Sequence, residues 1–78
     1  MAEGGRTVDC IGMFCPMPVL RLAKAVKASA VGERVELLAD DPAAKVDVPV
    51  WCRSRDQELL GIADRDGGGW VFTVRRAV

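Results

Sequence analysis

The sequence predicts an α+β fold, a two-layer α/β sandwich in which a four-stranded mixed sheet carries two helices on one face. Three observations lead to this prediction. The chain has 78 residues, enough for a single domain with one core. Its segments alternate between strand-type and helix-type apolar spacing, in the order βαβαββ. Two helices are too few to cover both faces of four strands, so they are expected to share one face.

The first half of the chain predicts a strand, a helix and a second strand. Residues 1–6 are expected to form a flexible N-terminus, and residues 7–10 the first strand. A helix is expected over 18–30, followed by Gly32 as its stop. The apolar stripe of this helix consists of Val19, Leu22, Ala23, Val26 and Ala30. Residues 33–39 alternate between apolar and charged side chains, as in a half-buried strand.

A second helix is expected within 43–54, and Pro49 leaves its start open. Either Asp41 caps a helix that is kinked at Pro49, or Asp47 is the N-cap. We favour Asp47, because a proline late in a helix removes a hydrogen bond and costs about 3 kcal/mol. Asp40 and Asp41 are then expected in a turn and cap after the second strand.

The last two strands are expected at 57–64 and 70–76, joined by a glycine-rich hairpin loop at 65–69. Strands that are separated by helices are expected to run parallel, and the terminal hairpin is expected to be antiparallel. The residues that share the inner face of the last strand are Trp70, Phe72 and Val74.

The composition excludes several classes of function. Eleven basic residues balance eleven acidic ones, which disfavours direct binding to nucleic acid. The chain has no histidine, and this excludes histidine triads and most catalytic zinc sites. No stretch reaches the roughly 18 apolar residues of a membrane span, and the first residues lack the apolar region of a signal peptide. We therefore expect a cytoplasmic protein with no membrane span, cofactor or metal.

Three cysteines, Cys10, Cys15 and Cys52, remain as candidates for chemistry. In a reducing compartment such residues are packing residues, metal ligands or reactive thiols. Cys52 is expected to pack in the second helix. A metal site of all three thiols lacks the usual Cys-x-x-Cys pairing. Cys10 either fills the end of the first strand or acts as a resolving thiol that forms a disulfide with Cys15.

A Cys-Pro-x-Pro motif, Cys15 to Pro18, lies at the predicted strand-to-helix turn. A helix N-terminus carries about half a positive charge, so it is expected to lower the pKa of Cys15 from ~8.5 toward ~7. Pro16 and Pro18 have no N–H group, which leaves those of Met17 and Val19 for an anionic sulfur. The competing interpretation is that Cys15 is a small buried hydrophobe beside an ordinary helix start.

Four short motifs occur in order along the chain. They are Asp9-Cys10-Ile11-Gly12, Cys15-Pro16-Met17-Pro18, Ala39-Asp40-Asp41-Pro42-Ala43 and Asp47-Val48-Pro49-Val50-Trp51-Cys52. Together they resemble the TusA (SirA-like) sulfur-carrier family, from Val8 to Arg75, and this resemblance implies the βαβαββ fold. It also implies that Cys15 takes a sulfane sulfur, holds it as a persulfide and hands it on. The implied partners are a cysteine desulfurase or another sulfane-sulfur donor, and a downstream acceptor protein.

Two positions depart from the family pattern. Cys10 stands where many members have alanine, and Phe14 where many have a basic residue. Phe14 and Met17 make the rim of the site apolar, while Trp51 is expected either in the core or in such a rim. The pathway stays open among tRNA thiolation, molybdenum cofactor supply, sulfur oxidation and thiosulfate assimilation.

Arg21, Lys24 and Lys27 follow one another at helical spacing after the motif. They form either a solvated face or, with Arg21 and Lys24 as the candidate contacts, a docking surface for an acidic partner. The sequence thus favours a monomeric sulfur carrier with sulfurtransferase activity at Cys15. The alternative is a thiol–disulfide redox protein that uses Cys10 and Cys15, whereas balanced charge disfavours an RNA-binding module.

Overall fold

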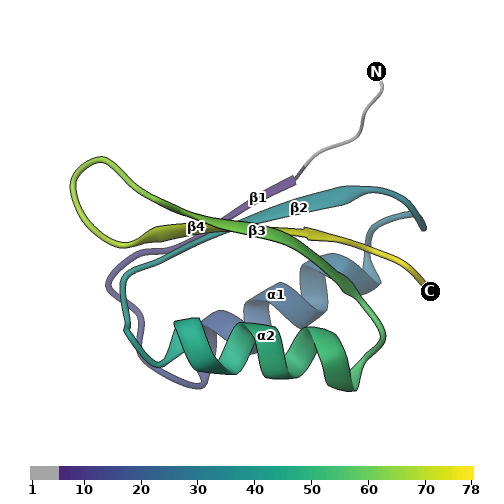
Figure 1. The fold of residues 1–78 in the computed structure, drawn as a ribbon, viewed down its shortest axis with the longest axis horizontal. Helices are drawn as coiled ribbons and strands as arrows, with labels where there is room; N and C mark the ends of the chain where they lie inside the picture. The colour runs from purple at the N-terminus through teal and green to yellow at the C-terminus, as the bar shows by residue number, and fades with distance from the viewer. Residues whose placement is uncertain (1–5) are drawn as a thin grey trace.

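The computed structural model describes residues 6–78, and Figure 1 shows a sheet with both helices packed on one face. The elements are β1 (Arg6–Cys10), α1 (Met17–Lys27), β2 (Arg34–Ala39), α2 (Ala44–Ser54), β3 (Glu58–Asp64) and β4 (Trp70–Arg75). This is the two-layer βαβαββ arrangement that the sequence predicts. The expected flexible start at 1–6 lies outside the described residues except for Arg6, which already belongs to β1.

The strands lie in the order β1-β2-β4-β3, so the last strand is inserted between the second and the third. β1 pairs with β2 in parallel, and β4 is antiparallel to both of its neighbours. β1, β2 and β3 therefore run in one direction, and both helices run back against them. As a result, the ends of β1 and β2 and the beginnings of α1 and α2 meet at one end of the molecule (Figure 1).

The core lies between the sheet and the two helices. Its largest fully buried side chains are Phe72, Leu22, Leu37, Val35, Val48, Val74 and Cys10. They are alternate residues of the strands and single stripes of the helices, as the two periodicities require. Full burial of a side chain such as Phe72 contributes roughly 1.5–3 kcal/mol. Within residues 6–78, neither helix has the length and apolar character needed to cross a bilayer.

The first helix ends earlier than its apolar pattern predicts. α1 stops at Lys27 with Ala28 as the C-cap, and the side chain of Ser29 donates a hydrogen bond back to the carbonyl of Ala25. Gly32 lies beyond this point, in the turn into β2, where its φ of +94° requires glycine. The predicted stop residue therefore makes the following turn and does not end the helix.

The prediction that Asp47 caps the second helix is wrong. α2 begins at Ala44, so Asp47 lies in its first turn and Pro49 inside the helix. Asp41 organises the start, because its carboxylate accepts the N–H of Ala43 at 3.1 Å and its carbonyl accepts that of Ala44 at 2.9 Å. Burial of one apolar stripe favours this longer helix despite the proline. The buried residues of the stripe are Ala44, Val48 and Cys52.

Candidate functional site

Cys15 is exposed in the turn between β1 and α1, at the end of the molecule where both helices begin. Pro16 is the N-cap of α1, and Met17 is its first residue. Around the thiol lies a small recess, lined by Cys15, Pro16, Pro18, Val19, Asp41, Ala44 and Asp47. The fold therefore brings the Cys-Pro-x-Pro turn together with two carboxylates from the second half of the chain.

Both carboxylates hold Cys15 directly. The thiol donates a hydrogen bond to Asp47, with 3.0 Å between Sγ and Oδ2. The backbone N–H of Cys15 donates to Oδ2 of Asp41 at 2.8 Å. In the same loop, the N–H of Gly12 donates to Oδ1 of Asp40 at 2.9 Å. The loop that carries the thiol is thus fixed to the segment that leads into α2.

This acidic surrounding raises the pKa of Cys15 above its ordinary value, so the predicted lowering is wrong for this conformation. The hydrogen bond to Asp47 is the largest cause, followed by desolvation and by the negative charges of Asp47 and Asp41. A thiol that donates to a carboxylate loses that bond when it ionises, and the new charge is then repelled. The resting state of Cys15 is consequently the protonated thiol.

The other residues of the motif shape the rim of the site. The N–H of Met17 donates to the carbonyl of Phe14 at 2.9 Å. The prediction that this N–H is available to the sulfur of Cys15 is therefore wrong. Pro18 is buried under the start of α1. Phe14, Met17 and Leu20 are 75%, 44% and 56% exposed, which gives the rim an apolar character.

The two other cysteines lie in the core. Cys10 is fully buried at the end of β1, and Cys52 is buried in α2, as predicted for a packing residue. Burial raises the pKa of Cys10, and it raises the pKa of Cys52 to about 11. All three cysteines are free. The interpretation of Cys10 as a resolving thiol stays a prediction, and a disulfide would require its buried sulfur to leave the core.

Of the candidate docking residues, Arg21 lies nearest to the site. Its guanidinium nitrogen Nη1 is 4.0 Å from the sulfur of Met13, in the loop that carries Cys15. Lys24 is exposed about one turn further along α1, and Lys27 ends the helix. Trp51 does not belong to the rim of the Cys15 site, because it packs half-buried against the core at a separate cavity.

Asp47 and Asp41 are the residues that sequence reasoning missed at this site. The sequence interprets both as turn or cap residues, because each is also a good helix-capping side chain. Their contacts with Cys15 span 32 and 26 positions and depend on α2 beginning at Ala44. The one signal in the sequence is that both aspartates belong to the motifs that carry the family resemblance.

Comparison with known proteins supports one family. The family model described as Sulfurtransferase TusA matches residues 6–76. A protein of Archaeoglobus fulgidus, described provisionally as a sulfur carrier protein, is 47% identical over 70 residues, which cover 90% of this chain and 91% of that protein. The crystal structure of a SirA-like protein from Desulfitobacterium hafniense shares the fold, with a TM-score of 0.82 at 23% identity over 94% of this chain and 99% of that one. The chain therefore belongs to the TusA sulfurtransferase family, the family of sulfur carriers that its motifs resemble.

Proposed function

We propose that the protein accepts a sulfane sulfur as a persulfide on Cys15 and relays it to a downstream acceptor protein. The supporting observation is the exposed Cys15 thiol, which rests in a hydrogen bond to Asp47 at the start of two helices. Exposure matters because a persulfide is transferred when a partner's thiol attacks its terminal sulfur. A monomer in the cytoplasm, where thiols stay reduced, suits this role.

Loading begins with removal of the Cys15 proton, because the thiolate is the nucleophile. Asp47 already accepts the thiol's hydrogen bond, so its carboxylate is the group placed to receive the proton. The sulfur of Cys15 then attacks the terminal sulfur of the donor's persulfide. A bond forms between those two sulfurs, the donor's own S–S bond breaks, and the donor leaves as a thiolate that takes up the proton. No external oxidant is needed.

Release is the reverse of the loading step. A thiolate of the acceptor attacks the terminal sulfur of the Cys15 persulfide, a new S–S bond forms on the acceptor, and the S–S bond at Cys15 breaks. Cys15 leaves as a thiolate and takes up the proton that the acceptor thiol has lost, which restores the hydrogen bond to Asp47. Stabilisation of the unloaded thiol by Asp47 therefore favours release.

Two surfaces beside Cys15 are available to partner proteins. The apolar rim of Phe14, Met17 and Leu20 offers area for hydrophobic contact. Arg21 and Lys24 follow on the exposed side of α1 and suit acidic residues of a cysteine desulfurase, of another donor or of the acceptor. We propose that both partners use this end of the molecule in turn.

Intact-protein mass spectrometry tests the proposal. The protein is incubated with a cysteine desulfurase and cysteine, and separately with thiosulfate, beside the Cys15→Ser variant. We expect the wild type to gain the mass of one sulfur, which a reductant removes, and the variant to gain none. The reductant step separates a persulfide from a sulfinic acid of nearly equal mass. A disulfide between Cys10 and Cys15 in place of the sulfur adduct would favour the redox function instead.

A further inference from the structure

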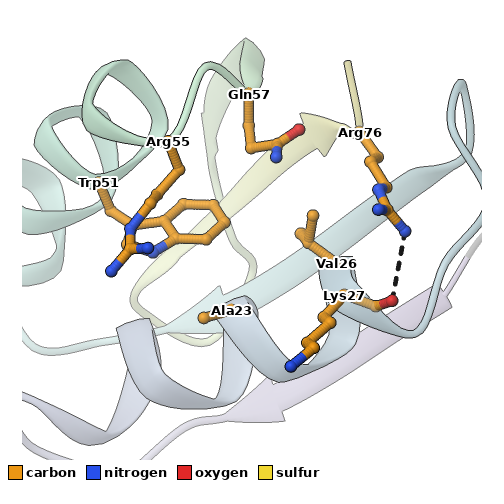
Figure 2. A pocket seen from close by; sticks show the side chains of 7 residues that line it. All are labelled: Ala23, Val26, Lys27, Trp51, Arg55, Gln57 and Arg76. Carbon is orange, nitrogen blue, oxygen red and sulfur yellow. Dashed lines mark hydrogen bonds between the residues drawn. The ribbon is translucent and has the colours of Figure 1, made fainter. Parts of the chain in front are cut away.

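A cavity of about 370 Å³ lies near the C-terminal ends of α1 and α2, whereas Cys15 lies before the start of α1. Figure 2 shows the residues that line this cavity. Its lining residues are Ala23, Val26, Lys27, Trp51, Arg55, Gln57 and Arg76. They come from the last turns of α1 and α2 and from the segments that follow α2 and β4. Since α1 has 11 residues and is therefore about 16 Å long, a molecule bound here leaves Cys15 uncovered.

The charges around this cavity are all positive. Lys27, Arg55 and Arg76 line it, and no acidic side chain does. Within residues 6–78, none of the three forms a salt bridge with an Asp or Glu side chain; the ion pair found there joins Arg75 and Glu58. The net charge of the chain is zero, so this local excess of positive charge is balanced elsewhere. Three aspartates lie around the loop of Cys15, at the other end of the helices.

Two of the polar groups are held in place by the backbone. Arg76 donates from Nη1 to the carbonyl of Lys27 at 3.2 Å and also to that of Ser29. Its Nε donates to the oxygen of Val78 at 2.8 Å. The side-chain oxygen of Gln57 accepts the N–H of Ala77 at 2.7 Å. These bonds leave the Nη2 group of Arg76 and the amide nitrogen of Gln57 without a partner among the described residues. Lys27 in the last turn of α1 and Arg55 at the C-cap of α2 also suit the negative ends of these helices. The result is that three cations gather around one cavity.

The cavity also has an apolar side. In Figure 2 the indole ring of Trp51 extends into the space between Arg55, Gln57 and Val26. Trp51 and Ala23 are half-buried; Trp51 packs against the core, and Val26 belongs to it. An occupant therefore meets an apolar surface in the middle and cationic or amide donors at the edges.

We propose that this cavity docks an acidic segment of a relay partner protein. An apolar side chain of that segment packs on Trp51 and Val26, and carboxylates on either side of it pair with Lys27, Arg55 and Arg76. In Figure 2 the cationic groups of Lys27, Arg55 and Arg76 lie on different sides of the cavity, so several separate carboxylates suit it better than one phosphate group. The negative ends of the two helices disfavour any anion here, so binding depends on these cations.

Such docking would hold the carrier on a partner without covering the reactive thiol. The inference rests on the proposed function in one respect, that the bound partner is a protein of the sulfur relay. Binding at the cavity itself does not require Cys15 to carry sulfur. Loading of Cys15 and docking at the cavity are therefore measured separately, and either one can fail alone.

The test is an NMR titration of the ¹⁵N-labelled full chain with three probes. The first is a blocked peptide, Gly-Glu-Glu-Leu-Glu-Glu-Gly; the second has glutamine in place of each glutamate; the third is adenosine monophosphate. We expect the glutamate peptide to shift the indole N–H of Trp51 and the amides of Lys27 and Gln57, with the amide of Cys15 unchanged. The glutamine peptide and the nucleotide are expected to shift none of these signals.

Matched charge reversals localise the binding. The double variant Lys27→Glu with Arg55→Glu is expected to bind the glutamate peptide about tenfold more weakly, because two exposed ion pairs are lost. Arg34→Glu with Arg53→Glu changes the net charge equally at exposed positions outside the cavity, and is expected to bind as the wild type does. The proposal is overturned by equal losses in both variants, by no shift at millimolar peptide, or by stronger binding of the nucleotide.

Discussion

At Cys15, two electrostatic effects act in opposite directions on one sulfur atom. The start of α1 favours the thiolate, whereas the hydrogen bond to Asp47 and the charges of Asp47 and Asp41 favour the thiol. The pKa of Cys15 is raised, because the hydrogen bond at 3.0 Å exists only while the sulfur is protonated. Two prolines near the helix start also remove backbone donors that would otherwise stabilise an anion.

Replacement of Asp47 tests this balance. In Asp47→Asn, the carboxylate charge and the strongest acceptor of the thiol are lost, so we expect the pKa of Cys15 to fall. The pKa is read from the rate of alkylation by iodoacetamide as a function of pH, with the modified residue identified by mass spectrometry. Asp66→Asn, in the exposed hairpin loop, is the control and is expected to leave the pKa unchanged. An unchanged or higher pKa in Asp47→Asn would contradict the role given to this carboxylate.

Cys10 offers a second test at the residue scale. Its side chain is fully buried at the end of β1, so we expect Cys10→Ala to lower the free energy of unfolding by roughly 1 kcal/mol through lost packing. The lifetime of the persulfide on Cys15 should stay within about twofold of the wild type, as measured by mass spectrometry over time. A much longer lifetime in the variant would instead identify Cys10 as the resolving thiol.

Among the elements, the strands are predicted well from the sequence, whereas the start of α2 is not. Alternation in β2 and β4 identifies strands and their inner faces, because a sheet residue's face follows from its position alone. The start of α2 is different, since Asp41 and Asp47 are both suitable caps and Pro49 favours the later one. The helix begins at Ala44, because this residue packs in the core. Such packing joins α2 to elements that are distant in the sequence, so it cannot be predicted from local pattern.

Replacement of Pro49 measures how much a proline inside α2 lowers the free energy of unfolding. Pro49→Ala restores a backbone N–H within α2, so it can donate to the carbonyl one turn earlier. We expect the free energy of unfolding in urea to rise by roughly 1 kcal/mol. A decrease would show that packing of the proline ring is worth more than the hydrogen bond it prevents.

Cys52 makes the stability of α2 depend on pH. Burial raises its pKa from 9.0 to about 11, so the unfolded chain loses this proton at lower pH than the folded chain does. The stabilising contribution is complete below about pH 9 and is lost as the pH rises toward about 11, by up to roughly 2–3 kcal/mol. Urea unfolding across this range should show a shallower decline in Cys52→Ala than in the wild type. Equal declines would contradict the assignment to Cys52.

Over the whole molecule, charge is separated along the helices. Aspartates surround the thiol at the beginnings of α1 and α2, and three cations line the cavity at their ends. The net charge of zero conceals this separation, because composition carries no information on position. The motifs identify the family and predict Cys15 as the carrier residue. The Cys15–Asp47 contact and the position of β4 inside the sheet depend on tertiary packing.

The most direct test of the central claim is to make Cys15 the only cysteine of the chain. The double variant Cys10→Ala with Cys52→Ala keeps Cys15, while the single variant Cys15→Ser keeps the other two thiols. Both are incubated with a cysteine desulfurase and isotopically labelled cysteine, and their intact masses are compared before and after reduction. We expect the double variant to gain one labelled sulfur that reduction removes, and Cys15→Ser to gain none. Loading of Cys15→Ser, or no loading of a folded double variant, would contradict the assignment of Cys15 as the carrier.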